Sequence, residues 1–284
     1  MLPGKVTILL QSKSYGTVQT ILSKTCTKTC FILNTGQLHK SSENMLCPAL
    51  SVVVPVYNAG ERVYSLVTAL EGFFMSRNAE LVLVDDCSTD QTIEYLRRIQ
   101  AYRPWLRVYS MPRNRGQHYA TLFGLQQARA IWCLTIDDDL PVPLDEVAKL
   151  LAFGTSASLP LVYGQYRRQY GDIMLRQVGS IAVSVLLRLA TGKKTVPSPL
   201  RLLQKNIVPG ELPGQGFFLD LHLLRNAEKA GGMLLKSHKR TPGRYSARKL
   251  LGMFCLLVKD ILFYRPLAKP ASQQLKHVPG NQVR

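Results

Sequence analysis

No stretch of this 284-residue sequence reaches 18 apolar residues without a charge, so no clear membrane-spanning helix is encoded. The six cysteines form no Cys-x-x-Cys pair and have no histidine at metal-ligand spacing, which argues against a zinc site and favours a reducing compartment. KVTILLQSK, near the amino terminus, has an apolar core too short for a signal peptide. The 46% of hydrophobic residues is enough to build one sizeable core.

Acidic residues are scarce and unevenly placed, with 18 of them against 36 lysines and arginines and a net charge of +18. Bases outnumber acids by 21 to 5 over residues 161–284, whereas acids lead by 12 to 10 over residues 45–160. A basic half is typical of proteins that meet nucleic acid, an anionic bilayer or a phosphorylated substrate. Because no module interleaves aromatic residues with bases, we predict no nucleic acid partner.

Hydrophobic periodicity begins at Leu50, and residues 1–48 are predicted to be a disordered extension. Strand patterns then alternate with helix patterns. The predicted strands are LSVVVPVY, ELVLVDD, LRVYSM and AIWCLTI, and the predicted helices are RVYSLVTALEGFF, TIEYLRRIQAY and ATLFGLQQARA. This alternation predicts an α/β fold whose central sheet is mainly parallel and covered on both faces.

Polar residues follow each predicted strand where the strand ends. They are Pro55–Asn58, Asp85 with Asp86, Asn114–Gln117, and Asp137–Asp139. The carboxyl ends of parallel strands meet at one edge of a sheet, where ligands bind. Three adjacent carboxylates repel one another unless a cation or a ligand compensates them. The edge therefore predicts a site for a nucleotide and for Mg²⁺ or Mn²⁺, which take oxygen ligands and bridge phosphates.

Plainer interpretations of the same residues stay open. Asp86 could begin a helix, with Ser88, Thr89 and Asp90 as ordinary capping residues. The aspartate triplet could be a set of solvated loop acids. His118, in the third polar loop, could be a general base or a residue that orders the loop or contacts a sugar.

Four stretches of the first half resemble family 2 glycosyltransferases of the GT-A fold: VVVPVYNAGERV, LVLVDDCSTDQT, NRGQHYATLFGL and TIDDDLPVP. Three stretches of the second half resemble the polyprenyl-phosphate glycosyltransferases, the group of dolichol-phosphate mannose synthase and bacterial undecaprenyl-phosphate sugar transferases: RQVGSIAVSVLLRLATG, PSPLRLL and HKRTPGRYSARKLL. The resemblance covers about residues 50–268. It implies a Rossmann-like αβα sandwich over residues 49–240 and a basic motif and membrane-interface helix over 241–268. The polar sequence after Pro266 predicts a disordered tail over 269–284.

The resemblance implies a metal-dependent, inverting transfer of a sugar from a nucleotide diphosphate sugar to a polyprenyl phosphate lipid, a step in making cell envelope polysaccharide. The protein would work as a peripheral protein at an anionic membrane surface on the cytoplasmic face, with an integral membrane protein as a candidate partner. A soluble or glycan acceptor and a catalytically silent GT-A-like scaffold are the alternatives.

The resemblance also implies roles for individual residues. The nucleotide would be bound by Pro55, Tyr57, Asp86, Asp137 and Arg244, and the metal by Asp137 and Asp139. Arg240 would act with the two metal-binding aspartates in catalysis, Arg167 and Arg176 would hold the acceptor phosphate, and the sugar pocket would contain Asn114, Gly116, Gln117 and His118. Three positions depart from the family pattern: Ala59 replaces an acid, Pro141 a glutamine and Tyr166 an arginine.

The segment RYSARKLLGMFCLLVKDILFYRPL predicts an amphipathic helix. Its apolar residues recur at three- and four-residue spacings: Leu250, Leu251, Phe254, Leu257, Val258, Ile261 and Leu262. Such a stripe suits a helix lying in the bilayer interface, and it also suits an ordinary helix packed on the domain. IAVSVLLRLA, residues 181–190, is a second candidate for the membrane face.

Overall fold

The structure, a computed structural model, describes residues 47–139, 143–166, 174–210, 218–235 and 247–263. The predicted extension over 1–48, except for its last two residues, and the predicted tail over 269–284 lie outside these ranges. So do Pro141, Arg167, Arg240 and Arg244. None of the described helices is long and apolar enough to span a bilayer.

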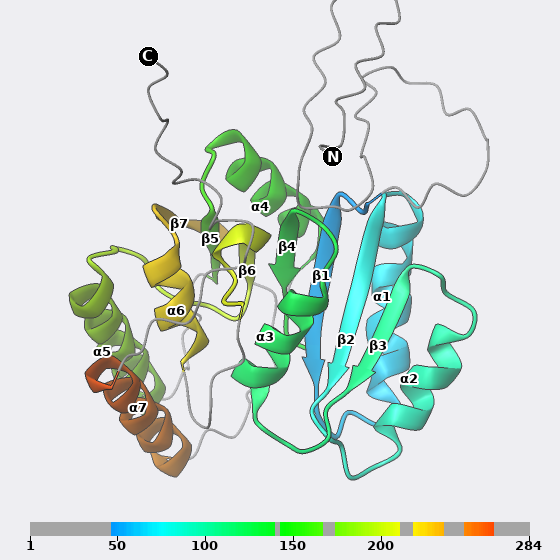
Figure 1. Ribbon diagram of the computed structural model, residues 1–284, viewed down its shortest axis with the longest axis horizontal. Coiled ribbons are helices and arrows are strands. Elements are labelled where there is room, and N and C mark those ends of the chain that lie inside the picture. Colours follow the sequence, from blue (N-terminus) through cyan, green and yellow to red (C-terminus); the bar gives the residue numbers. More distant parts are fainter. Residues whose placement is uncertain (1–46, 140–142, 167–173, 211–217, 236–246, 264–284) are drawn as a thin grey trace, which may run out of the picture. The chain divides into compact units, whose positions relative to one another are not determined.

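The described strands form a sheet in the order β3-β2-β1-β4-β6-β5-β7 (Figure 1). They are β1 (Leu50–Val56), β2 (Ala79–Asp85), β3 (Leu106–Ser110), β4 (Trp132–Thr135), β5 (Leu161–Tyr166), β6 (Arg201–Gln204) and β7 (Ala230–Leu235). Strand β6 runs antiparallel to both of its neighbours, β4 and β5, and every other pairing is parallel. The prediction of a mainly parallel α/β sheet is therefore confirmed.

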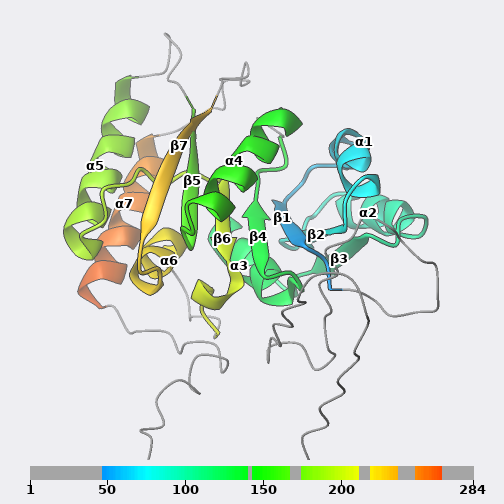
Figure 2. The ribbon, with the colours of Figure 1, turned by 90° about the horizontal axis from the view of Figure 1, so that it is seen from above.

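Helices cover both faces of this sheet (Figure 2). They are α1 (Arg62–Met75), α2 (Thr92–Gln100), α3 (Gln117–Gln127), α4 (Leu144–Ser156), α5 (Met174–Thr191), α6 (Leu219–Asn226) and α7 (Ala247–Leu262), with a short 3₁₀ helix at Lys205–Ile207. Helices α1, α2 and α4 pack on one face, and α3 and α6 on the other. Helices α5 and α7 contact each other beside α6 (Figure 1).

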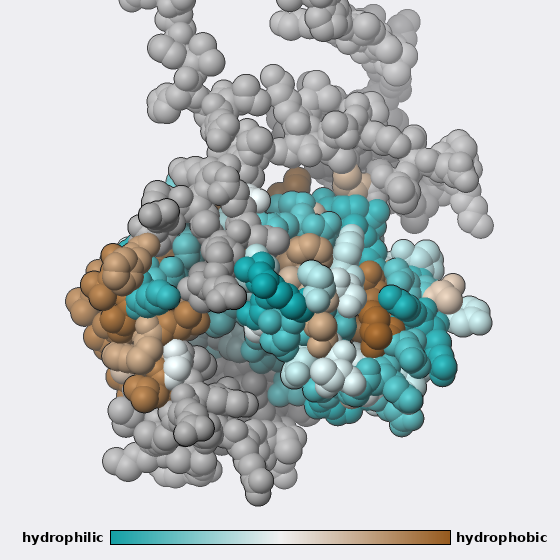
Figure 3. Space-filling model, turned by 60° about the horizontal axis from the view of Figure 1, so that its bottom comes forward, coloured by the Kyte–Doolittle hydropathy of each residue, from teal (hydrophilic) through white to brown (hydrophobic). Residues whose placement is uncertain are grey.

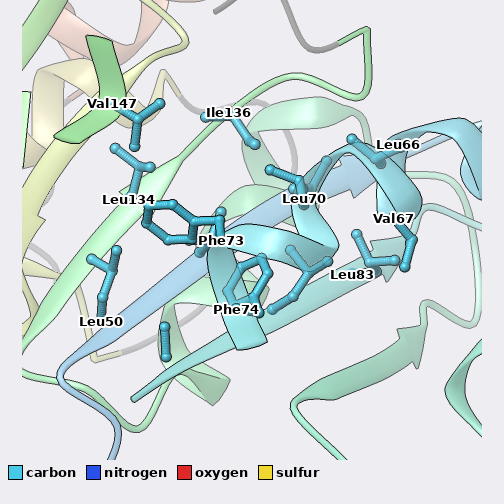
Figure 4. Close-up of a cluster of buried hydrophobic side chains, with 14 of the residues drawn as sticks. Leu50, Leu66, Val67, Leu70, Phe73, Phe74, Leu83, Leu134, Ile136 and Val147 are labelled. Carbon is cyan, nitrogen blue, oxygen red and sulfur yellow. The ribbon is translucent and has the colours of Figure 1, made fainter. Parts of the chain in front are cut away.

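Strands β1 and β2 are buried along their whole length, which explains why they read as continuous apolar runs. On one face, Leu70, Phe73 and Phe74 of α1 pack against Leu50, Leu83 and Leu134 of the sheet (Figure 4). Phe74 also stacks on Trp105, with ring centroids 4.9 Å apart. This core fixes the first four strands, whose carboxyl ends carry the predicted site.

Helix α3 lies unusually close to the face of the sheet that is opposite to α1. A Cβ atom at Gly124 would come within 2.5 Å of a Val53 methyl and 2.9 Å of a Val84 methyl. Only glycine allows this approach, because any side chain would displace the sheet residues below it. The close packing holds the start of α3, with Gln117 and His118, at the edge of the sheet beside the end of β4.

Candidate active site

The loop after β1 and the loop after β2 are hydrogen-bonded to each other. The backbone N–H of Asn58 donates to Ser88 Oγ at 3.0 Å, and the N–H of Thr89 donates to Asn58 Oδ1 at 2.9 Å. Asn58 has a φ of 48°, a left-handed conformation that asparagine tolerates better than most residues. The two loops therefore form one surface at the sheet edge.

Thr92, at the start of α2, completes this connection. Its Oγ1 accepts the backbone N–H groups of Ala59 at 3.0 Å and Gly60 at 2.8 Å, and its hydroxyl donates to Asp90. Asp90 also accepts the N–H of Thr92 at 3.0 Å, as a residue preceding a helix commonly does. The N-cap of α2 is Gln91, so Asp90 orders the turn just before the helix without capping it, and Ser88 bonds Asn58 and Asp85.

Asp86 connects the second loop to the third. The residue is 3% exposed, and its Oδ1 accepts the backbone N–H of Arg115 at 2.9 Å while Oδ2 accepts that of Gly116 at 2.7 Å. Burial raises the pKa of Asp86, and the two hydrogen bonds oppose that rise only in part. Gly116 has a φ of 89°, which only glycine adopts without strain. Asp86 therefore shapes the loop that leads into α3, and does not simply begin a helix.

Asp85, which was predicted only to lie at this edge, is buried beside Asp86. It accepts the N–H of Ser88 at 3.2 Å and the hydroxyl of Ser110 at 3.1 Å, and it also bonds the hydroxyl of Ser88. Asp85 thus links β2 to β3 and to its own loop.

The aspartate triplet follows β4 at the same edge. The side-chain amide of Gln117 donates to Asp137 Oδ1 at 2.6 Å, so the third and fourth loops are also in contact. Asp138 is half-buried, and burial raises its pKa, with Arg62 opposing the rise and Asp139 adding to it. The prediction that the four polar loops share one edge is therefore confirmed through direct contacts.

The aspartates of this edge differ from a metal cage built by the protein alone. No group of three or more histidine, cysteine, aspartate or glutamate side chains able to hold a metal occurs among the described residues. Asp137 and Asp139 offer carboxylate oxygens, the donors that Mg²⁺ and Mn²⁺ prefer. Mg²⁺ is commonly bound by one or two carboxylates together with substrate phosphates and water. This donor set fits a metal that arrives with a nucleotide, and does not fit a cage made by the protein alone.

The other predicted site residues lie as follows. Pro55 is buried within β1, and Tyr57, just after β1, is 46% exposed and available to a ligand. Asn114 is exposed, in the loop that Asp86 organises. Arg176 lies in α5, but its side chain is outside the described set.

His118 packs against Phe218, with ring centroids 4.8 Å apart. Burial lowers the pKa of His118 to about 4, while Asp220 opposes this shift and Arg201 adds to it. A histidine with this pKa is neutral at pH 7 and is a poor proton acceptor, because efficient general bases have a pKa near the working pH. Of the two interpretations of His118, the geometry favours the residue that orders the loop or contacts a sugar.

Sequence reasoning missed a buried ion pair behind the site. Arg201 of β6 makes two parallel bonds to Asp220 of α6, Nε to Oδ1 at 2.7 Å and Nη2 to Oδ2 at 2.9 Å. Tyr163 of β5 donates to Asp220 Oδ1 at 2.9 Å, and Arg201 also donates to Thr135 Oγ1 at the end of β4 at 3.3 Å. The pair thus connects four elements at the end of β4. Burial would lower the pKa of Arg201, but the charge of Asp220 above all, with a smaller contribution from Asp137, raises it. The one sequence feature that could have revealed it is a lone arginine beginning the apolar strand RLLQ.

Comparisons with known proteins show the family of the chain. The model of the family described as Glycosyl transferase family 2 matches residues 51–209. An undecaprenyl-phosphate 4-deoxy-4-formamido-L-arabinose transferase of Pectobacterium carotovorum is 31% identical over 169 residues, 57% of this chain and 51% of that protein. The protein of the same name from Yersinia enterocolitica is 30% identical over 227 residues, 76% of this chain and 68% of that protein. The chain spans about half the length of the first of these curated relatives.

Two solved structures resemble the fold. Glucosyl-3-phosphoglycerate synthase of Mycobacterium tuberculosis, in complex with phosphoglyceric acid, has a TM-score of 0.54 and 23% identity, covering 76% of this chain and 79% of that one. Mannosyl-3-phosphoglycerate synthase of Rubrobacter xylanophilus has a TM-score of 0.55 and 15% identity, covering 76% and 73%. Another structure of the mycobacterial enzyme contains Mn²⁺, uridine-diphosphate-glucose and phosphoglyceric acid, with a TM-score of 0.54 and 22% identity. At these identities the likeness shows the fold alone, and it confirms the predicted GT-A architecture.

Proposed function

Because this chain belongs to glycosyltransferase family 2, we propose that it transfers a sugar from a nucleotide diphosphate sugar to a membrane polyprenyl phosphate, with inversion at the anomeric carbon. One observation carries the proposal: the contacts of Asp86 with Gly116 and of Gln117 with Asp137 join the polar loops of the sheet edge into one continuous site. The names of the Pectobacterium and Yersinia relatives support undecaprenyl phosphate as the acceptor class.

The donor half of the proposal assigns the nucleotide to the first two loops. Tyr57 is exposed and suited to contact a base, and Asp86 has further lone pairs on its carboxylate that could accept a base N–H. Asp137 and Asp139 would hold Mg²⁺ or Mn²⁺ together with the diphosphate. The metal would neutralise the charge that develops on the leaving diphosphate. The Mn²⁺ and nucleotide sugar in the mycobacterial neighbour make this cofactor chemically reasonable.

The acceptor half needs no strong base. A phosphate oxygen is already anionic near neutral pH, so it can attack the anomeric carbon as the nucleoside diphosphate leaves. What this chain then contributes is alignment of the two substrates and fixed positive charge near both phosphates. We assign the acceptor phosphate to Arg167 and Arg176, and the donor diphosphate to Arg240 and Arg244, from the family resemblance alone.

An exposed apolar surface suits the lipid. Helices α5 and α7 present exposed side chains that we call the α5/α7 face, and Figure 3 shows brown, hydrophobic residues gathered on the side where these helices lie. Its members are Ile181, Val185, Leu189, Leu251, Phe254, Leu262 and, just beyond α7, Phe263. The exposed bases Arg188, Lys194 and Lys259 lie on these helices or directly after α5, and a basic residue near an anionic membrane contributes about 1 kcal/mol to binding.

The predicted stripe of α7 divides between two roles. Leu257 is fully buried in the core and Ile261 packs against that core, whereas Leu251, Phe254 and Leu262 are exposed. The helix is therefore packed on the domain through one side and leaves its other side exposed, which supports the proposed contact with a bilayer. Peripheral attachment at the cytoplasmic face of a membrane, with an integral membrane protein as a further partner, completes the proposal.

Donor binding is tested first by thermal shift, with UDP-, GDP- and dTDP-sugars in the presence of Mg²⁺ or Mn²⁺. One of these should raise the melting temperature, and Asp139→Ala should abolish the metal-dependent part of the rise. Asp145→Ala, which removes a well-exposed acid from α4, is the matched control and should respond as the wild type does. A wild type that binds no nucleotide sugar would favour the catalytically silent scaffold.

Acceptor binding is tested by transfer of labelled sugar to undecaprenyl phosphate in phosphatidylglycerol vesicles. Deleting α7 would uncover the core at Leu257, so point substitutions are the better probe. The pair Leu251→Gln and Leu262→Gln should reduce both vesicle binding and transfer, whereas Ile131→Gln, an exposed apolar residue away from the α5/α7 face, should change neither. Transfer that is insensitive to the pair, or that occurs only to soluble acceptors, would overturn the lipid assignment.

A further inference from the structure

An acidic side chain connects α7 to the start of α6. Asp260 of α7 accepts the backbone N–H of Phe218 at 2.9 Å through Oδ2, and the same oxygen lies 3.1 Å from Nε2 of His222. The side chains of Asp260 and His222 are 11% and 4% exposed, so both contacts are largely shielded from water. We call these contacts the Asp260 bridge.

The Asp260 bridge stands out against the chemistry of the two helices. Asp260 is the only acid in the sequences of α5 and α7, which otherwise contain apolar residues, a few small polar ones and bases. A carboxylate directed toward anionic lipid would weaken binding, and a carboxylate buried without partners would be costly. Asp260 avoids both because it lies on the inner side of α7, opposite the exposed Leu251 and Leu262.

The bridge continues to the donor site through two further contacts. The ring of Phe218, whose N–H Asp260 accepts, packs on His118 at 4.8 Å between centroids. His118 follows Gln117 in the first turn of α3, and Gln117 donates to Asp137 at 2.6 Å. A displacement of α7 toward or away from α6 would therefore move Phe218, and with it the start of α3 and the amide that contacts Asp137.

We propose that Asp260 is a positioning residue that couples seating of the α5/α7 face on a lipid bilayer to the binding of the nucleotide at Asp137. The inference rests on the proposed function. When α7 is held against the bilayer, the bridge keeps Phe218 against His118, and the start of α3 holds the geometry that accepts the nucleotide. A bilayer should then raise nucleotide affinity, and by linkage the nucleotide should raise bilayer affinity by the same factor.

The experiment measures this factor with the full chain. UDP is titrated calorimetrically in the presence of Mn²⁺, with and without vesicles of phosphatidylglycerol and phosphatidylcholine in equal parts, and GDP replaces UDP if GDP-sugars gave the thermal shift. Coupling between sites commonly lies in the range of about 5- to 150-fold, so we expect vesicles to tighten nucleotide binding at least about 5-fold in the wild type. Vesicle sedimentation with and without the nucleotide gives the reciprocal value.

Three substitutions separate coupling from simple stability. Asp260→Ala removes the acceptor and should bring the factor close to one, with unchanged nucleotide affinity in the absence of vesicles. Asp260→Asn keeps an oxygen for the Phe218 N–H and should retain most of the coupling. Phe218→Leu keeps the backbone bond to Asp260 but removes the ring from His118, so it should also lose coupling. Asp145→Ala is the charge-matched control and should behave as wild type.

The results distinguish a failure of the coupling from a failure of the proposed transferase function. Vesicles that bind the wild type but leave nucleotide affinity unchanged would overturn the coupling while leaving the transferase proposal intact. Full coupling in Asp260→Ala or in Phe218→Leu would do the same. If one of these two variants does not fold, the other decides, and the wild-type comparison decides if neither folds. Failure of the proposed function is seen separately, as an absence of sugar transfer to undecaprenyl phosphate.

Discussion

The buried pair of Arg201 and Asp220 gives the sharpest test of the interior behind the site. We expect Asp220→Asn to destabilise the protein strongly, because an asparagine can accept from Arg201 through only one oxygen and directs an amide donor at the other guanidinium N–H. Burial by itself would raise the pKa of Asp220, but the adjacent Arg201 charge and the hydrogen bonds hold it below its usual value. The carboxylate is therefore ionised at neutral pH, and the substitution leaves a buried cation without its counter-charge.

The expected size follows from the contacts. Removing one partner of a buried, doubly hydrogen-bonded ion pair costs about 3–5 kcal/mol, and the same holds for Arg201→Met. This is a large part of the roughly 5–15 kcal/mol that keeps an ordinary domain folded. Replacing both charges by apolar groups is commonly close to neutral, apart from the Tyr163 hydroxyl, which would lose its acceptor at a cost of about 1–3 kcal/mol.

The assay is urea unfolding, followed by far-ultraviolet circular dichroism and by the fluorescence of the two tryptophans. The triple variant Arg201→Met, Asp220→Leu and Tyr163→Phe should be more stable than either single charge variant. The double-mutant cycle between Arg201 and Asp220 should give a coupling energy of at least about 2 kcal/mol. Additive losses, or a loss below about 1 kcal/mol for Asp220→Asn, would refute the claim that this pair is buried and mutually dependent.

Three further predictions concern the loops of the site. Thr92→Val should lower the unfolding free energy by about 2 kcal/mol in urea titrations, because the backbone N–H groups of Ala59 and Gly60 lose their acceptor. An unchanged unfolding midpoint would contradict the connection between the two loops. Asp86→Ala should weaken nucleotide binding at least about 10-fold in calorimetry. The substitution removes two charge-assisted hydrogen bonds of about 1.5–3 kcal/mol each and so frees the loop at Gly116. Equal affinity in the variant would show that other contacts hold this loop. His118 has a lowered pKa in the folded protein, so its contribution to stability is present above pH 6.5 and is lost as the pH falls toward 4. Relative to His118→Gln, the wild type should therefore lose stability between those pH values in denaturant titrations, and parallel curves would contradict the shift.

The first half of the fold was predictable largely because β1, β2 and most of β4 are buried on both faces. Buried parallel strands read as continuous apolar runs, and the polar residues that follow them mark the carboxyl edge. Helix α3 was predicted from Ala120 and begins at Gln117, because its first turn is polar and packs at the site. Strand β4 is shorter than the predicted AIWCLTI at both ends.

The second half was predicted far less well, for reasons of chemistry. Strand β6 is four residues long and runs antiparallel to β4 and β5, and β5 pairs with β7 across more than 60 residues of sequence. Strand β7 contains Gly231 and Gly232, which carry no strand preference. Glycine is required at these positions for lack of room, because a Cβ atom at Gly231 would contact Leu159 and a Cβ atom at Gly232 would contact Gln165. Such requirements arise only once the strands are paired.

The site also has one part that was predictable from the sequence and one part that was not. Residue types at strand ends were sufficient to place Asp86, Asp137 and Gln117 at one edge, because a parallel sheet brings strand ends together whatever the loops do. The acceptors and donors that unite the loops were not predictable, since Asp86 bonds backbone N–H groups and any residue supplies one. The side chain that makes such a contact can be predicted from sequence, but its backbone partner cannot.

The bases of residues 161–284 differ in whether they are buried or exposed. Arg201 is one of the 21 bases of residues 161–284, yet it is buried and neutralised by Asp220, so it adds nothing to the outer field. Exposed bases such as Arg188, Lys194 and Lys259 lie beside the apolar α5/α7 face, where an anionic surface would attract them. Asp260 lies on the inner side of the same helix and does not oppose that attraction. Exposed cations beside exposed leucines, with Asp220 buried and Asp260 on the inner side of α7, support the proposed contact with a bilayer rather than with nucleic acid, whose binding would require aromatic or polar groups among the bases.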